Sequence, residues 1–189
     1  MEPTQEHFSK QVTEARQVFI GIPTNETQDL EIVSLGFEKC LPEFLIERDS
    51  NPATGKKSSK KYFTTLEIIT GGKGELILNQ KKYKLGPGSF FNYGVGTYHR
   101  ISSSTTHPLV KYFLVLAHQS DSESIKQISE KPFFPKIRNL GEIIELFELL
   151  LSNANSGSDH SIAVCTHLAN ALVLKISELL KSSEEKQAR

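Results

Sequence analysis

The 189-residue sequence has no tryptophan, one methionine and only two cysteines. Cys40 and Cys165 lie far apart and form no Cys-x-x-Cys motif, so neither a disulfide framework nor a cysteine zinc site is expected. Both residues are interpreted as buried free thiols. The length and a hydrophobic content of 38% allow one substantial core with a small appendage.

An excess of charge of one sign is also lacking, because 22 Lys and Arg residues balance 22 Asp and Glu residues. No bulk attraction toward nucleic acid or an anionic membrane is therefore expected. The first residues, Met1–Glu6, have neither a basic start nor an apolar stretch, and no apolar run approaches the roughly 18 residues of a membrane span. We expect a soluble, cytoplasmic protein with no membrane partner.

What the sequence does contain is a series of short runs rich in Val, Ile, Phe and Tyr, separated by Gly, Pro and Asn. The predicted strands are 17–22, 30–36, 43–48, 62–70, 74–79, 82–84, 89–93, 99–102 and 109–117. Asn79-Gln80 predicts a tight hairpin, and Gly86-Pro87-Gly88 and Gly94-Val95-Gly96 predict two further reversals. Many short strands at this spacing favour a barrel or a sandwich.

The hydrophobic period becomes helical after the segment Lys131-Pro132-Phe133-Phe134-Pro135. One apolar face is formed by Leu140, Ile143, Ile144, Phe147, Leu150 and Leu151. Asn139 and Glu142 are placed to form a capping box at the start of this helix. A polar break at 152–159 leads to a second amphipathic helix over 161–181, so the sequence predicts a helical hairpin.

The apolar stripe of this hairpin must be buried against the rest of the chain, against another chain, or both. The succession Leu172-Val173-Leu174 widens the stripe beyond one face, which favours a homodimer contact. The residues predicted to form that contact are Leu168, Leu172, Ile176 and Leu179. The alternative is a hairpin packed wholly on its own β-domain.

Two glycine-rich segments carry a resemblance to a known family. The first is 66–79, with Gly71-Gly72-Lys73-Gly74, and the second is 83–99, which runs through Gly86-Pro87-Gly88 to His99. Together with the later hairpin they resemble the N-terminal effector-binding and dimerisation domain of AraC-family transcriptional regulators. The resemblance covers roughly residues 30–180 and implies a mainly β fold, a cupin (jelly-roll) barrel followed by a C-terminal α-helical hairpin.

The family organisation implies five segments in this chain. They are an N-terminal arm (1–16), a ligand-binding barrel (17–118), a connector (119–138), a dimerisation hairpin (139–183) and the start of a linker (184–189). In such regulators two helix-turn-helix units follow, and they need about a hundred further residues. DNA binding is therefore expected only through a C-terminal domain that is absent from these residues.

Cupin enzymes hold a metal with a His-x-His pair, a Glu and a later His, and only the last of these matches, as His99. The positions of the first pair fall at 59–61, and Thr65 stands where the Glu is expected. One imidazole cannot form such a site, so we expect no catalytic residue, no metal and no cofactor. A two-ligand site of His99 and Glu67 is the alternative.

A cupin barrel without its metal keeps a cavity, which the resembling regulators use for a sugar or a similar effector. By matched position the ligand-binding candidates are Arg48, His99, Lys111 and Phe113, and Glu67 joins them by strand parity. The cations and the imidazole can bind hydroxyls or a carboxylate, and Phe113 can stack on a sugar ring. Two cations favour an acidic effector such as a uronate.

Each candidate has a plainer interpretation. Arg48 could pair with Glu43 or Glu47 at the surface, Lys111 and Glu67 could face solvent, and His99 and Phe113 could be ordinary core residues. Four lysines in the loop 50–61 could contact phosphate, although a solvated loop is the simpler interpretation: Lys56, Lys57, Lys60 and Lys61.

The predicted function is effector sensing and dimerisation within a transcription regulator, without enzymatic activity. Two other functions stay open: a metal-dependent cupin enzyme that relies on His99, and a non-enzymatic interaction module with an empty barrel.

Overall fold

The computed structural model describes residues 11–21, 30–48, 62–119, 122–137, 139–158 and 160–187. Within them the strands are β1 (Val12–Phe19), β2 (Leu30–Cys40), β3 (Leu45–Arg48), β4 (Tyr62–Gly71), β5 (Gly74–Leu78), β6 (Lys81–Leu85), β7 (Phe90–Gly94), β8 (His99–Ser103), β9 (Val110–His118) and β10 (Phe133–Phe134). The helices are α1 (Glu123–Ser129), α2 (Leu140–Ala154) and α3 (Ser161–Gln187). The predicted fold class, mainly β with C-terminal helices, is confirmed.

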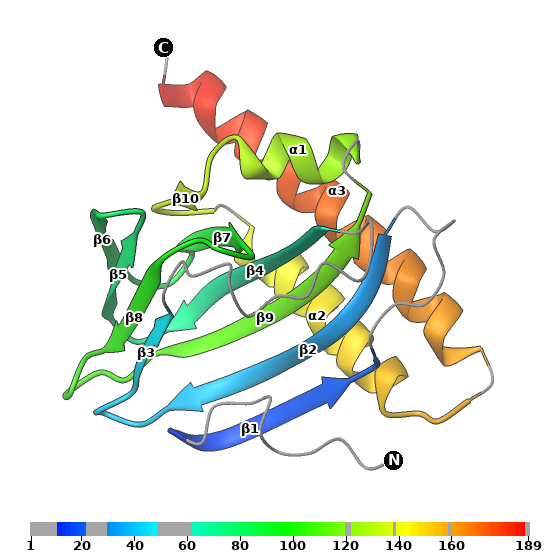
Figure 1. The fold of residues 1–189 in the computed structure, drawn as a ribbon, viewed down its shortest axis with the longest axis horizontal. Coiled ribbons are helices and arrows are strands. Elements are labelled where there is room, and N and C mark those ends of the chain that lie inside the picture. The colour runs from blue at the N-terminus through cyan, green and yellow to red at the C-terminus, as the bar shows by residue number, and fades with distance from the viewer. Residues whose placement is uncertain are drawn as a thin grey trace.

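The described strands form two antiparallel sheets (Figure 1). The large sheet has the order β1-β2-β9-β4-β7-β10, and the small sheet has the order β3-β8-β5-β6. The predicted hairpin between β5 and β6 is confirmed, because Asn79 and Gln80 have φ of 47° and 66°, as a type I′ turn requires. The centre of the large sheet joins strands far apart in the sequence: β9 pairs with both β2 and β4.

Side chains of the large sheet alternate between two environments, because successive strand residues point to opposite faces. One face is apolar and packs under the helices in a core that includes Leu35, Leu66, Ile68, Leu114 and Leu116. The other face turns toward the small sheet. There, a second apolar cluster contains Phe44, Ile69, Leu76, Phe91, Ile101 and Leu109.

The helical hairpin packs on the apolar face of its own large sheet, and α3 contacts α1, α2 and β2. This packing buries three of the residues predicted for the dimer contact: Leu172 and Ile176 are fully buried, and Leu179 is 6% exposed. Leu168 is partly buried against the same core. Three of the four predicted residues are therefore engaged in packing within the chain, and a dimer contact at these residues stays a prediction.

Several predicted boundaries also shift. β1 begins at Val12, so residues 12–16 of the predicted arm belong to the sheet, and the connector contains α1 and β10. α3 continues to Gln187, over the start of the predicted linker. Asn139 makes no side-chain cap and contacts the Glu142 side chain instead, so the capping box is wrong. The loop lysines 56, 57, 60 and 61 lie outside the described residues.

Within the described residues, one helical segment, Ser161–Ser182 of α3, is long and apolar enough by composition to cross a membrane, and an 18-residue window within it has a mean hydropathy of 1.4. The sequence expectation overlooked it because polar residues such as His167 and Asn170 interrupt the apolar positions. In the structure 39% of that window is buried within the chain. Core helices have the same composition, so the segment is weak evidence for a membrane span.

Candidate functional site

A cavity of about 610 Å³ lies between the two sheets. The large sheet supplies most of its lining from the charged face of β2, β4 and β9, and the small sheet supplies Ile46, Arg48 and His99. The turn after β7 adds Val95, Gly96 and Thr97. The volume lies within the range of small-molecule sites.

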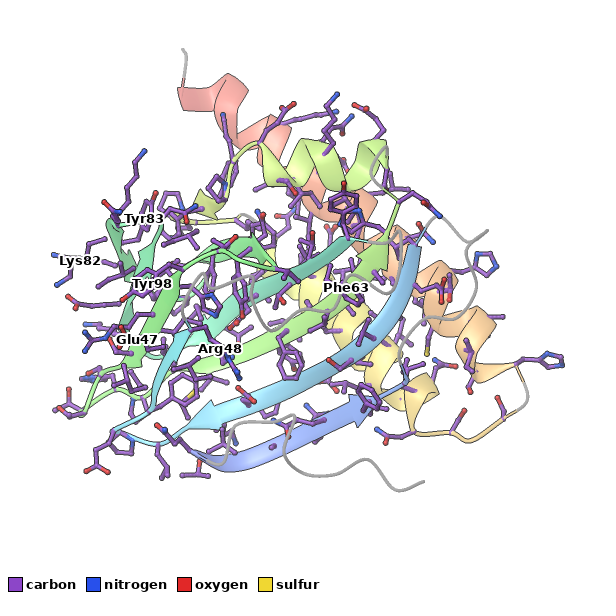
Figure 2. All side chains as sticks on the ribbon, viewed as in Figure 1. Glu47, Arg48, Phe63, Lys82, Tyr83 and Tyr98 are labelled. Carbon is purple, nitrogen blue, oxygen red and sulfur yellow. The ribbon has the colours of Figure 1, made fainter. Side chains whose placement is uncertain are left out.

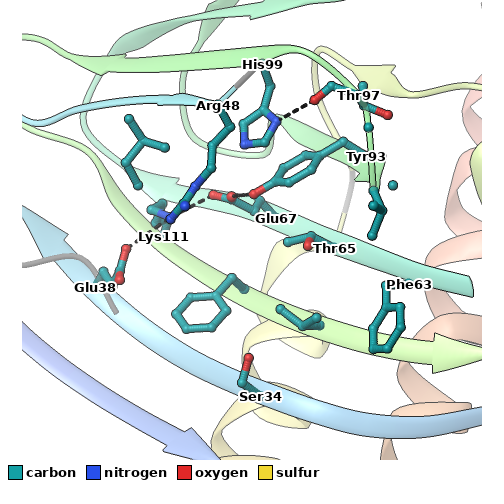
Figure 3. A pocket seen from close by; sticks show the side chains of 16 residues that line it. Ser34, Glu38, Arg48, Phe63, Thr65, Glu67, Tyr93, Thr97, His99 and Lys111 are labelled. Atoms are coloured by element: carbon teal, nitrogen blue, oxygen red, sulfur yellow. Dashed lines mark hydrogen bonds and ion pairs between the residues drawn. The ribbon is translucent and has the colours of Figure 1, made fainter. Parts of the chain in front are cut away.

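The floor of the cavity carries a buried triad of charges, shown in Figure 3. The Lys111 ammonium lies 2.8 Å from a Glu67 oxygen and 3.0 Å from the Glu38 Oε2, and the side chains of all three residues are only 3–4% exposed. The strand register explains the pairing, since Glu38 lies directly opposite Lys111. Burial by itself would lower the pKa of Lys111. The attraction of the two carboxylates together is the larger effect, and the pKa of Lys111 is raised above its ordinary value.

The Glu38 carboxylate is bound unequally at its two oxygens. The Gln17 amide donates to Oε1 at 2.6 Å. Oε2 is within ion-pair distance of Lys111, but the geometry is not that of a hydrogen bond, and Oε2 accepts none from the described residues. A buried acceptor without a hydrogen-bond donor is rare in folded proteins.

Tyr93 and His99 form the adjacent wall. The Tyr93 hydroxyl donates to Glu67 at 2.6 Å, and its ring stacks on the His99 imidazole with centroids 3.9 Å apart. Burial, with the nearby Glu67 charge, raises the pKa of Tyr93 well above 10, so this hydroxyl stays a donor. Figure 3 shows the two rings together beside Glu67.

Burial favours the neutral form of the His99 imidazole. Burial lowers its pKa from the ordinary value, and its Nδ1 lies 3.0 Å from the Thr97 carbonyl oxygen. A carbonyl can only accept, so Nδ1 must carry the proton. Nε2 is then an acceptor, and it makes no hydrogen bond to any described residue.

Arg48 lines the cavity from the last position of β3, where it is paired with His99 across the small sheet. Unlike the triad it is exposed to solvent, so it lies at the cavity opening. The predicted alternative, a surface ion pair with Glu43 or Glu47, does not form within the described residues. Glu47 instead accepts from Tyr98 and lies 4.0 Å from Arg100. Figure 2 shows Arg48 and Phe63 over the large sheet, and Lys82 on the hairpin formed by β5 and β6.

The rest of the lining is largely apolar and includes Phe63, Phe113 and Val115. The Phe113 ring fits because its cross-strand neighbour is Gly36, where a Cβ would overlap the ring. A substitution at Gly36 would therefore push the ring into the cavity. Thr65, at the position where cupin enzymes carry a metal-binding Glu, lines the same space.

The arrangement disfavours the two-ligand metal site of His99 and Glu67. Both Glu67 oxygens are engaged, one by the Tyr93 hydroxyl and one by the Lys111 ammonium. In the part of the chain that the structure describes, no group of three or more His, Cys, Asp or Glu side chains is placed to hold a metal.

The five predicted ligand-binding residues, Arg48, Glu67, His99, Lys111 and Phe113, all line this one cavity. Their role in binding stays a prediction. Sequence reasoning missed Glu38 because the predicted strand ended at Gly36, whereas β2 runs on to Cys40. Ser34, Gly36 and Glu38 are two residues apart along the chain, so they share one face of a strand. This alternation was the sequence signal that could have placed Glu38 in the cavity. Tyr93 was placed on a strand, but nothing in the sequence marked it as a partner of Glu67.

Two of the comparisons with known proteins found nothing. No family model matches the chain, and no curated protein matches it. Solved structures do match, at low identity. The chain is similar to KdgF from Halomonas sp., at 15% identity and a TM-score of 0.37, over 62% of this chain and 92% of that one.

Two other similar structures come from regulators. The AraC-like transcriptional activator CuxR is 12% identical with a TM-score of 0.47, over 81% of this chain and 52% of that one. The cupin_2 domain of an XRE-family transcriptional regulator from Enterobacter cloacae is 15% identical with a TM-score of 0.36, over 55% of this chain and 95% of that one. The structural neighbours are thus cupin domains, from regulators and from enzymes such as a salicylate 1,2-dioxygenase.

Proposed function

We propose that this chain is the effector-sensing part of an AraC-type transcription regulator, in which a small polar molecule binds the cavity between the sheets. A carbohydrate or a uronate is the candidate effector. The role is non-enzymatic and cytoplasmic, and DNA is contacted by a separate C-terminal domain.

The observation that carries the proposal is the buried charge of the cavity. Lys111, Glu38 and Glu67 occupy positions where apolar residues would stabilise the fold at least as well, because desolvation of buried charges offsets most of their attraction. Buried charges whose desolvation lowers the stability of the fold, beside a cavity of about 610 Å³, are typical of a site that binds a polar ligand.

The direct test is a thermal-shift screen of the purified chain against a library of polar metabolites. A true effector raises the melting temperature by mass action, and the shift is lost in Arg48→Ala or Lys111→Ala. Arg100→Ala is the matched control, since Arg100 lies on β8 without lining the cavity. A shift that persists in both cavity variants would reject this cavity as the effector site.

The regulatory part has its own test. The coding sequence downstream of the Arg189 codon should continue into two helix-turn-helix units. A stop codon there would remove the DNA-binding half of the proposal and leave the ligand-binding half standing.

A homodimer remains part of the proposal, but through other residues than those predicted. Among the described residues of the hairpin, the large apolar side chains that are exposed are Leu149, Ile162, Val164 and Leu174, between 39% and 62% exposed. Analytical ultracentrifugation should show a dimer that Leu174→Glu weakens. A monomer at all concentrations would remove dimerisation from the proposed function.

A further inference from the structure

We propose that the ligand of this cavity is bipolar: a hydroxyl or ammonium group at its inner end donates to Glu38, and an anionic group at its outer end faces Arg48. This inference rests on the proposed function, and it adds the chemistry and the orientation of the ligand.

The inner end of the cavity is a hydrogen-bond acceptor. Glu38 is 3% exposed and presents Oε2 without a hydrogen-bond donor among the described residues. The neutral His99 offers a second acceptor at Nε2, because its proton is held on Nδ1 by the Thr97 carbonyl. A ligand donor would supply the hydrogen bond that Oε2 lacks and that its ion pair with Lys111 does not provide.

The lysine does not reverse this preference. Lys111 is shared between two carboxylates, so the triad carries one net negative charge. A carboxylate placed at the inner end would face two carboxylates that share a single ammonium, and it would be repelled. The sequence-based argument that two cations favour an acid therefore applies only to Arg48.

The outer end has the opposite character. Arg48 lines the cavity, is exposed, and makes no ion pair with a described residue. The field therefore runs from negative at the buried floor to positive at the opening, which orients a ligand with a donor at one end and an anion at the other. Between them, Phe63, Phe113 and Val115 offer an apolar surface for the ligand body.

Two sources supply this chemistry: sugar acids, whose donors are hydroxyls, and amino acids, whose donor is an ammonium. Titration calorimetry on the whole chain separates them. The probes are a panel of hexuronates and L-amino acids. Each probe is compared with two analogues: one has an alcohol in place of the carboxylate, and the other has hydrogen in place of the donor group.

The bipolar probe of one source should bind, and each single-ended counterpart should bind at least roughly tenfold more weakly. Binding by the uronate set identifies hydroxyl donors, and binding by the amino-acid set identifies an ammonium. Equal binding of single-ended counterparts, or no binding by either set, overturns the bipolar inference. The wider metabolite screen then decides separately whether the cavity binds an effector at all.

Variants complete the test. Glu38→Gln and Arg48→Gln should each weaken the bipolar probe at least roughly tenfold. The matched controls Glu75→Gln and Arg100→Gln remove the same charges at exposed ion pairs outside the cavity and should change affinity less than about twofold. Arg48→Gln alters an exposed residue, so it keeps the test decisive if Glu38→Gln fails to fold. An unchanged affinity in Arg48→Gln overturns the outer-end assignment.

Discussion

The two faces of the large sheet are built from the same strands but have opposite chemistry. On β9, Leu114 points into the apolar core beneath the helices, while Lys111 points into the cavity and is held by two carboxylates. On β4, Glu67 stands between Leu66 and Ile68 in the same way. The helix face is apolar throughout this core, whereas the cavity face adds buried charges beside its own apolar cluster.

The largest expected effect is at the charged face. Lys111→Met leaves two buried carboxylates without their cation and should lower the free energy of unfolding by about 3–5 kcal/mol. Urea denaturation measures the loss. The combined variant Glu38→Leu, Glu67→Leu, Lys111→Met should recover most of it, because no buried charge remains. A triple variant as unstable as the single one would show that the triad is a stabilising element.

The apolar face should respond differently. Leu114→Ala creates a cavity in a fully buried core and should cost about 2–5 kcal/mol. Ligand affinity should stay within about twofold in the folded protein, since Leu114 faces away from the site. Denaturation and calorimetry on the same sample separate the two effects. A large loss of affinity would show that the two faces are coupled.

A smaller, pH-dependent effect belongs to His99. Its pKa is lowered in the folded state by burial, so as pH falls below the ordinary histidine value of about 6.5 the unfolded chain takes up the proton first. The stability contributed by the neutral imidazole is therefore complete above that pH and is lost as pH falls toward the lowered pKa. His99→Gln should reduce the slope of stability against pH between about 7 and 5, and the exposed His107→Gln should leave it unchanged. Equal slopes in all three proteins would contradict the assignment.

The smallest effect is expected where β1 meets α2. Arg16 binds both oxygens of Glu148 at 2.6 Å, but both side chains are 40% or more exposed. Solvent screening limits such a pair, so Arg16→Gln should cost about 0.2–1 kcal/mol. A thermal melt at low and high salt measures it, and a loss above 2 kcal/mol would show that β1 anchors the helices.

The sequence predicted the order and nature of the strands because the β pattern is local: alternation and glycine turns mark each strand without knowledge of its neighbours. It placed Lys111 and Glu67 in one cavity through a family motif and strand parity. It could not show that they neutralise each other, because that depends on the register between β4 and β9. It also could not show that the hairpin packs on its own sheet, since an apolar stripe such as Leu172 and Ile176 does not reveal which surface covers it.

The pairing of β9 with both β2 and β4 also sets the order in which the protein can be made. Leu30 meets His118 in the register, so the floor of the cavity closes only after the chain has been synthesised past β9. Until then β2 and β4 both lack the strand that lies between them. Their apolar side chains are not yet covered by α2 and α3. Long-range pairing of this kind slows folding and exposes unpaired strand edges. During translation the nascent protein therefore passes through a stage in which the cavity does not exist and the edges of β2 and β4 are unpaired.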